Sequence, residues 1–101
     1  MARKIVWSNP ALEDLVAAVE FIAKDSEAYA ANLAQLAVEA AESLVQFPYR
    51  GHKVPDPKLS RFRELIIGSY RVIYLIESKR VLIVAVLHGH RALRRALKGR
   101  V

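Results

Sequence analysis

RFRELIIGSYRVIYLIESKRVLIVAVLHGHR, residues 61–91, is the stretch that decides the fold of this chain of 101 residues. Its aliphatic, β-branched and aromatic runs are interrupted by turn-forming residues at Gly68-Ser69 and Ser78-Lys79. This pattern predicts three antiparallel strands joined by two tight turns. Much of the predicted sheet is apolar on both faces, and it ends in a basic cluster of His88, His90 and Arg91.

The two turns set an expected register for the hairpins. The first hairpin is expected to pair Ile67 with Tyr70, Leu65 with Val72, and Arg63 with Tyr74. The second is expected to pair Ile76 with Val81, Val72 with Ala85, and Arg71 with Val86.

Alternation along the strands assigns the side chains to two faces. The bulkier and less charged face is expected to pack on helices, and it holds Leu65, Ile67, Tyr70, Val72, Tyr74, Ile76, Val81, Ile83, Ala85 and Leu87. The other face holds Phe62, Glu64, Ile66, Arg71, Ile73, Leu75, Leu82, Val84, Val86 and His88. On this second face, Arg71 and His88 are expected to be diagonal neighbours on adjacent strands.

The first half of the chain predicts a short strand and an antiparallel helical hairpin. Residues 3–7 read as the strand, and Ser8-Asn9-Pro10 is typical of a helix start. That helix should end near Lys24, with one apolar face formed by Leu12, Leu15, Val16, Val19 and Ile22. A second helix, about Glu27 to Gln46, is expected to be capped by Asp25 or Ser26. Its polar stripe is narrow, so it should contact both the first helix and the sheet.

Two further segments complete the chain. Residues 48–60 contain three prolines and read as a basic loop. Residues 90–101 read as a short basic helix ended by Gly99, or as a frayed basic tail. The whole chain is therefore expected to form one α+β domain, residues 1–101, with the helical hairpin packed on a small, mostly antiparallel sheet.

The composition excludes several classes of protein. Cysteine is absent, which rules out disulfides, Cys-based zinc sites and thiol catalysis, and is compatible with the cytoplasmic location that we expect. Charges interrupt every apolar run, so we expect no membrane span. Residues 1–47 carry three Lys/Arg and seven Asp/Glu, a net of −4, whereas residues 48–101 carry 13 and three, a net of +10. The basic half favours a polyanionic partner.

The residues at the end of the sheet suggest one kind of chemistry. The chain has no glycine-rich phosphate loop, HExxH or GxSxG, and its histidines lack acidic companions at ligand spacing, so we expect neither metal nor cofactor. Cleavage of an RNA phosphodiester needs a base for the 2′-hydroxyl, an acid for the leaving 5′-oxygen, and cations for the phosphate. Four residues fit these roles: Arg71, His88, His90 and Arg91. The alternative is that they are basic residues at a strand end that bind nothing.

The chain resembles the RelE/ParE toxins of bacterial type II toxin–antitoxin systems over nearly its whole length. The resemblance rests on the element order and on four motifs: W-S-x-x-A-x-x-D-L at 7–15, L-x-x-F-P-x-x-G at 44–51, RELIIGSYRVIY at 63–74 and VLHGHRAL at 86–93. It implies a fold with the helical hairpin packed on one face of the sheet. It also implies growth arrest by the free toxin and a cognate antitoxin that wraps it in a hetero-oligomer.

Members of this family differ in their target. RelE-like proteins cut messenger RNA on the ribosome, whereas ParE-like proteins inhibit DNA gyrase and cut no RNA. By resemblance, Arg71 and Arg91 match arginines of the cleaving type, and His88 or His90 would serve as acid or base. Residues expected to hold RNA are Lys53, Arg61, Arg63, Arg94 and Arg95.

Three positions depart from the RelE pattern. Phe62 and Glu64 stand where RelE has two strand lysines, and Leu97 stands near the position of its C-terminal tyrosine. These departures also fit a ParE-like protein. Ribosome-dependent mRNA cleavage is our first hypothesis from sequence, and gyrase inhibition without catalysis is the alternative.

Overall fold

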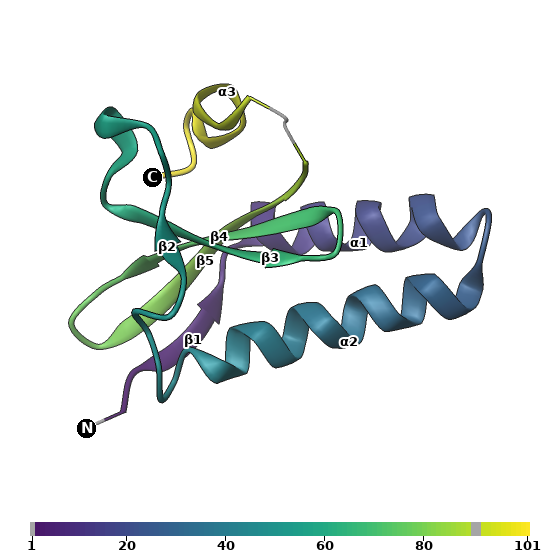
Figure 1. Cartoon of the computed structure of the whole chain (residues 1–101), viewed down its shortest axis with the longest axis horizontal. Coiled ribbons are helices and arrows are strands. Elements are labelled where there is room, and N and C mark those ends of the chain that lie inside the picture. The colour runs from purple at the N-terminus through teal and green to yellow at the C-terminus, as the bar shows by residue number, and fades with distance from the viewer. Residues whose placement is uncertain (1, 90–91) are drawn as a thin grey trace.

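The computed structural model describes residues 2–89 and 92–101. A five-stranded sheet in this part of the chain carries two helices on one face and a short helix on the other (Figure 1). The strands are β1 (Lys4–Trp7), β2 (His52–Lys53), β3 (Phe62–Ile67), β4 (Tyr70–Ile76) and β5 (Arg80–His88). The helices are α1 (Asn9–Ala23), α2 (Glu27–Ser43), the 3-10 helix η1 (Pro57–Leu59) and α3 (Leu93–Leu97). The expected α+β class is confirmed.

The strand order is β1-β5-β4-β3-β2, with β1 parallel to β5 and the other neighbours antiparallel. The first hairpin has the predicted register, with Ile67 opposite Tyr70. Gly68 adopts a φ of 61° at the first turn position. Glycine reaches this left-handed region without a steric penalty, and a two-residue turn of this kind matches the twist of the two strands.

The predicted register of the second hairpin is wrong beyond its first part. Ile76 lies opposite Val81 as expected, but Val72 lies opposite Val86 and Arg71 opposite Leu87, one residue further along β5. A β-bulge causes the shift, because Ile73 pairs with Ala85 while Tyr74 pairs with Ile83, which leaves Val84 as an extra residue. The bulge reverses the face of the sheet to which each later side chain of β5 points. Val86 therefore packs toward α1 and α2, and Ala85 and Leu87 pack on the other face.

The helical hairpin begins where local signals place it. The Oγ atoms of Ser8 and Ser26 accept hydrogen bonds from the N–H groups of Ala11 at 3.1 Å and Tyr29 at 3.2 Å. Each hydroxyl satisfies a backbone donor that the first turn of a helix leaves unpaired. The second helix ends at Ser43, three residues before the predicted Gln46.

The buried face of α1 differs from the predicted one. Ala11 and Ala18 are buried, whereas Leu12 and Val16 are 44% and 53% exposed. Small residues allow the helix to lie close to the sheet, and this rotates the larger pair out toward solvent. Leu15, Val19 and Ile22 do pack against the core as expected.

Residues 48–60 contain more structure than the predicted loop. His52 and Lys53 form β2 on the edge of the sheet, and η1 follows after Asp56, whose Oδ1 accepts the N–H of Lys58 at 3.0 Å. A strand of two residues gives no periodic signal, whereas the three prolines of this segment are typical of a loop.

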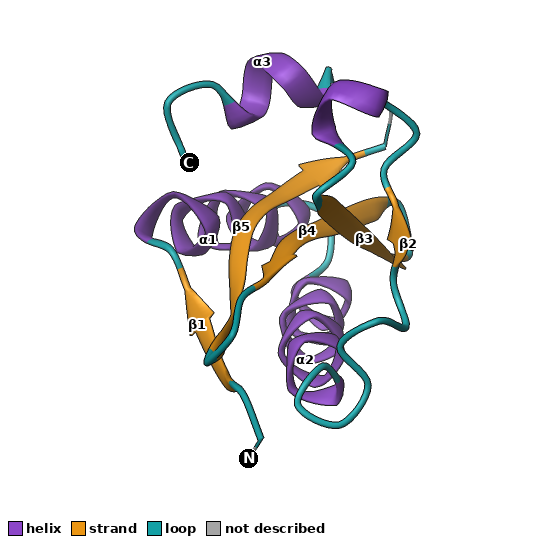
Figure 2. Cartoon of the chain, turned by 90° about the vertical axis from the view of Figure 1, so that its left-hand side faces the viewer, coloured by secondary structure: helices purple, strands orange, loops and turns teal. Residues whose placement is uncertain are grey.

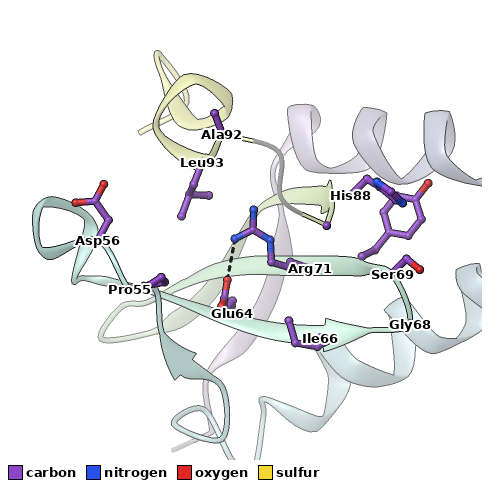
Figure 3. A pocket seen from close by; sticks show the side chains of 12 residues that line it. Pro55, Asp56, Glu64, Ile66, Gly68, Ser69, Arg71, His88, Ala92 and Leu93 are labelled. Atoms are coloured by element: carbon purple, nitrogen blue, oxygen red, sulfur yellow. Dashed lines mark hydrogen bonds and ion pairs between the residues drawn. The ribbon is translucent and has the colours of Figure 1, made fainter.

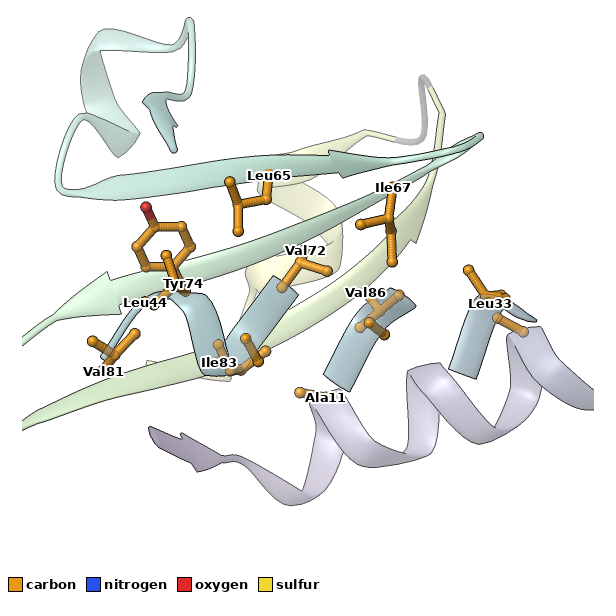
Figure 4. Packing of buried hydrophobic residues seen from close by; sticks show 13 residues of the cluster. Ala11, Leu33, Leu44, Leu65, Ile67, Val72, Tyr74, Val81, Ile83 and Val86 are labelled. Carbon is orange, nitrogen blue, oxygen red and sulfur yellow. The ribbon is translucent and has the colours of Figure 1, made fainter. Parts of the chain in front are cut away.

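Two apolar cores explain why the sheet is apolar on both faces. One lies between the sheet and the helical hairpin; Figure 4 shows Leu44 of the α2 C-terminus and Val72 and Val86 of the sheet within it. The other lies under α3, where Leu97 packs with Phe62 and Leu75. Figure 2 shows α3 on the opposite side of the sheet from α2. Of the two alternatives predicted for the tail, the structure has the short helix, α3, and Gly99 follows it with a φ of 79°.

Across residues 2–89 and 92–101, no helix is both long and apolar enough to cross a membrane.

Candidate functional site

An open groove of about 770 Å³ runs over the face of the sheet that carries α3 and reaches the β3–β4 turn, where Gly68, Tyr70 and His88 line its end. Its floor is the outer part of β3 and β4, and its walls are the start of α3 and the loop before η1. Figure 3 shows the side chains that line it, among them Asp56, Glu64, Arg71, His88 and Leu93. Two of the four residues predicted to be catalytic, Arg71 and His88, therefore line one groove.

Glu64 is the buried charge at the centre of this groove, with 6% of its surface exposed. His52 lies directly opposite it on β2, and its Nε2 is 2.8 Å from Glu64 Oε1. Arg71 is its diagonal neighbour on β4, and the Nη1 atom of Arg71 donates to Oε2 at 3.1 Å. A buried carboxylate requires such partners, because its desolvation is otherwise very costly.

The Arg71 side chain is held within the sheet rather than presented freely to a ligand. It is 15% exposed, and Figure 3 shows its guanidinium turned toward Glu64. The predicted phosphate-binding charge is therefore neutralised in part by a neighbouring anion. The predicted faces already placed Glu64 and Arg71 on the same side of the sheet, and this was the signal that would have identified the pair.

The predicted contact between His88 and Arg71 is not formed. His88 lies directly opposite Tyr70, and their rings meet edge to face with centroids 5.0 Å apart. The bulge at Val84 is the cause, since it reverses the side to which every later residue of β5 points. His90 and Arg91, the other two predicted catalytic residues, lie outside the described residues.

The residues predicted to bind RNA are not gathered at this groove. Arg63 lies on the other face, where its Nη1 donates to the carbonyl oxygens of Gly51 at 2.6 Å and Tyr49 at 3.3 Å. The Arg61 guanidinium lies 5.0 Å from the centroid of the Phe62 ring. Two others, Lys53 and Arg95, are exposed.

Arg94 forms an ion pair that joins α3 to the loop before η1. Its Nε and Nη2 both donate to the carboxylate of Asp56, with Nη2 2.9 Å from Oδ1. The hydrogen bonds from Arg94, and then from the Lys58 N–H, lower the pKa of Asp56 to about 2. The same pair raises the pKa of Arg94. The pair closes one wall of the groove.

The motif residues around Tyr74 have a structural role. The Tyr74 hydroxyl is buried, donates to the Pro48 carbonyl oxygen at 2.8 Å and accepts the Gly51 N–H at 3.0 Å. Burial raises its pKa. A Cβ atom at Gly51 would lie 2.5 Å from this hydroxyl, so only glycine fits. The L-x-x-F-P-x-x-G and G-x-Y-R-x-x-Y motifs therefore meet at one buried hydrogen-bond centre.

Comparisons with known proteins agree with this architecture. The family model described as ParE toxin of type II toxin-antitoxin system, parDE, matches residues 5–93. The chain is similar to a structure of the chromosomal ParDE system from P. aeruginosa, with a TM-score of 0.73, 18% identity, and coverage of 88% of this chain and 98% of that one.

A second similar structure is from the RelBE2 toxin–antitoxin complex of Mycobacterium tuberculosis. Its TM-score is 0.60 at 24% identity, and the alignment covers 87% of this chain and 99% of that one. The comparison with curated proteins gave no match. Because the family model spans most of the chain, including the hairpins that build the groove, the chain belongs to the ParE toxin family of type II toxin–antitoxin systems.

Proposed function

We propose that this toxin arrests growth by binding DNA gyrase and that it does not cut RNA. The observation that supports this is the ion pair between Glu64 and Arg71 at the centre of the groove. Catalysis of phosphodiester cleavage relies on positive charge that is aimed at the developing charge on phosphate. Here a buried carboxylate already occupies part of the hydrogen-bonding capacity of the sheet arginine.

The position of His88 supports the same function. Its ring is in contact with Tyr70, and the bulge has moved it away from the side of the sheet on which Arg71 lies. A general acid or base must come within hydrogen-bond reach of the proton that it transfers. A ParE-like toxin needs no general acid or base, because it inhibits gyrase by binding to it.

The test is a pair of assays on the purified chain. Relaxed plasmid is incubated with gyrase, ATP and increasing toxin, and supercoiling should be lost. The same toxin is added to a cell-free translation reaction, in which the message should remain intact. Prior incubation with the cognate antitoxin should restore supercoiling. Full supercoiling at a large excess of toxin would contradict the proposal.

Ribosome-dependent mRNA cleavage remains a second candidate, favoured by one observation: Arg71 and His88 line the same groove of about 770 Å³. In this reaction the base takes the 2′-hydroxyl proton, the 2′-oxygen attacks phosphorus, and the acid protonates the departing 5′-oxygen. Arg71 and Arg91 would contact phosphate, with His88 or His90 as acid or base. Cut message in the translation reaction, lost in Arg71→Ala and Arg91→Ala toxins, would support it.

We further propose that a cognate antitoxin covers the apolar surface between α2 and the β3–β4 turn. A pocket of about 410 Å³ lies there, lined by Tyr29, Leu36, Ile67 and Tyr70. Tyr29 is 73% and Leu36 is 40% exposed, an unusual placement for large apolar side chains that lie together. The two similar structures come from toxin–antitoxin systems, which supports a partner of this kind.

A further inference from the structure

A second, smaller groove of about 250 Å³ lies between η1 and the C-terminal part of α3. Figure 2 shows α3 on the outer side of the sheet, away from α2. The cations that line the groove are Lys58, Arg61, Arg94 and Lys98, and Phe62 and Leu97 form its apolar floor. None of the Asp or Glu side chains in the described residues lines it.

The groove around Arg71 and this second groove differ in net charge. The first contains Glu64 and Asp56, and each is paired with an arginine. In the second, the Lys58 and Lys98 side chains are exposed and have no ion pair among the described residues. Among the described residues, exposed lysines are therefore found in the groove beside α3, whereas the acids that line the Arg71 groove are paired with arginines.

The arginines of the second groove are held in place. Asp56 fixes Arg94 through two of its nitrogens and also accepts the Lys58 backbone N–H at 3.0 Å, which orients the loop that carries Lys58. The Arg61 guanidinium lies against the Phe62 ring. Side chains that are already ordered lose less conformational entropy when they bind, so the surface is suited to a ligand with repeated negative charges.

We propose that this groove binds the phosphodiester backbone of a nucleic acid, with Lys58, Arg61 and Lys98 on phosphate oxygens. The ligand chemistry follows from the side chains, because lysine and arginine are the principal donors to phosphate, and several cations that line one groove suit a ligand with several phosphates. Binding is independent of base sequence. Inhibition of gyrase by protein contact does not require this binding, so the proposal goes beyond the proposed function. Arg61 is among the residues expected from the sequence to hold RNA, and the groove adds Lys58 and Lys98 to it.

The experiment measures fluorescence anisotropy of labelled 24-base-pair DNA and 24-nucleotide RNA with the purified full chain over a range of salt concentrations. The site variant is Lys58→Gln with Lys98→Gln. The matched control is Lys4→Gln with Lys79→Gln, which removes the same charge at two exposed lysines that do not line the groove. Circular dichroism checks that both variants fold.

The site variant should bind about tenfold more weakly at low salt, and for duplex DNA the slope of log K against log salt should fall by about two. The control should bind within about twofold of wild type. Tighter binding of DNA or of RNA identifies which nucleic acid supplies the backbone. Equal losses in both variants, an unchanged slope, or no binding by the wild type at low salt would overturn the proposal. Gyrase inhibition is measured separately, so the two proposals fail independently.

Discussion

Tyr74 shows at the scale of one residue how two distant segments are joined. Its hydroxyl is fully used, donating to the Pro48 carbonyl and accepting the Gly51 N–H. Removal of the hydroxyl would leave both backbone groups without this partner in a buried site. Unpaired buried polar groups cost free energy because they lose their hydrogen bonds to water and gain nothing in return.

We therefore expect Tyr74→Phe to lower the free energy of unfolding by about 1–3 kcal/mol. Urea denaturation followed by circular dichroism measures this change. Tyr29→Phe is the matched control, since Tyr29 is 73% exposed and should change stability by less than about 0.5 kcal/mol. Equal stability of the Tyr74 variant and the wild type would contradict the structural role of the L-x-x-F-P-x-x-G and G-x-Y-R-x-x-Y motifs.

Glu64 and Arg71 form the pair on which the proposed mechanism depends. Their side chains are 7% and 15% exposed, so removal of either charge leaves the other in a poorly solvated site. Glu64→Gln should lower the free energy of unfolding by about 2–4 kcal/mol, and His52→Gln by less, because the His52 side chain is 64% exposed.

A double-mutant cycle with Arg71→Met measures the interaction between Glu64 and Arg71 separately from the contacts that each makes with other residues. We expect a coupling energy of at least about 1 kcal/mol between Glu64→Gln and Arg71→Met. Additive losses would show that the two side chains do not interact and that Glu64 does not neutralise Arg71.

At the scale of an element, the bulge in β5 is held by residues from the two ends of the chain. Asp14 Oδ2 accepts the Val86 N–H at 3.0 Å, and Arg100 Nη1 donates to the Val84 carbonyl oxygen at 3.0 Å. The two side chains also pair with each other, with Arg100 Nη1 2.6 Å from Asp14 Oδ2, and this pair raises the pKa of Arg100. They cover the edge of β5 beyond the end of β1, where backbone groups would otherwise be open.

Asp14→Asn should therefore loosen this edge. We expect a loss of about 1–3 kcal/mol in the free energy of unfolding and faster hydrogen exchange at the Val86 amide. Glu20→Gln, at an exposed position of the same helix with no ion pair among the described residues, serves as the control and should change neither quantity. Unaltered exchange at Val86 in the Asp14 variant would mean that the bulge does not need this bond.

The contact between α3 and the η1 loop should depend on pH. The pKa of Asp56 is lowered from 3.8 to about 2, so the folded chain favours the ionised carboxylate. Its stabilising contribution is then complete above pH 3.8 and is lost as the pH falls toward 2.

Asp56→Asn should flatten the dependence of stability on pH between 4 and 2, as measured by urea midpoints at a series of pH values. The exposed Asp25, which has no ion pair among the described residues, provides the control as Asp25→Asn. If the wild type and the Asp56 variant lose stability in parallel over this range, the ion pair with Arg94 does not hold α3 in solution.

For the whole molecule, charge and apolar surface are separated in space. The three acidic residues of the basic half each pair with an arginine, namely Asp56 with Arg94, Glu64 with Arg71, and Glu77 with Arg80. The helical hairpin carries the other acidic residues and six of the ten exposed large apolar side chains of the described residues. One side of the molecule is thus suited to a polyanion, and the side of α2 beside the β3–β4 turn to a protein partner.

Leu36→Glu should weaken binding of the cognate antitoxin by about tenfold to a hundredfold, because burial of a leucine contributes about 1.5–3 kcal/mol. Isothermal titration calorimetry measures the change. Val38→Glu is the control, since Val38 is 50% exposed on the same helix but does not line the pocket beside the β3–β4 turn. A similar loss for both variants would place the antitoxin elsewhere on α2.

Local signals in the sequence were sufficient for much of this fold. Ser8 and Ser26, each one of two adjacent candidates for the cap, cap their helices, and the turn at Gly68 sets the register of the first hairpin. These features depend on residues within a few positions of one another, so the pattern along the chain contains them. The motifs also predicted the family, which the family model confirms.

The remaining features were decided by contacts between distant residues. The backbone at the bulge is hydrogen-bonded by two side chains that are distant in sequence. Asp14 lies 72 positions from its partner Val86, and Arg100 lies 16 positions from its partner Val84. No pattern within β5 indicates the bulge, yet this one extra residue moves His88 away from Arg71. The sequence alone therefore determined the family, the longer helices and strands and the first hairpin. Tertiary structure determined which side chains share a site, because a single unpaired residue in a strand reverses the face of all that follow.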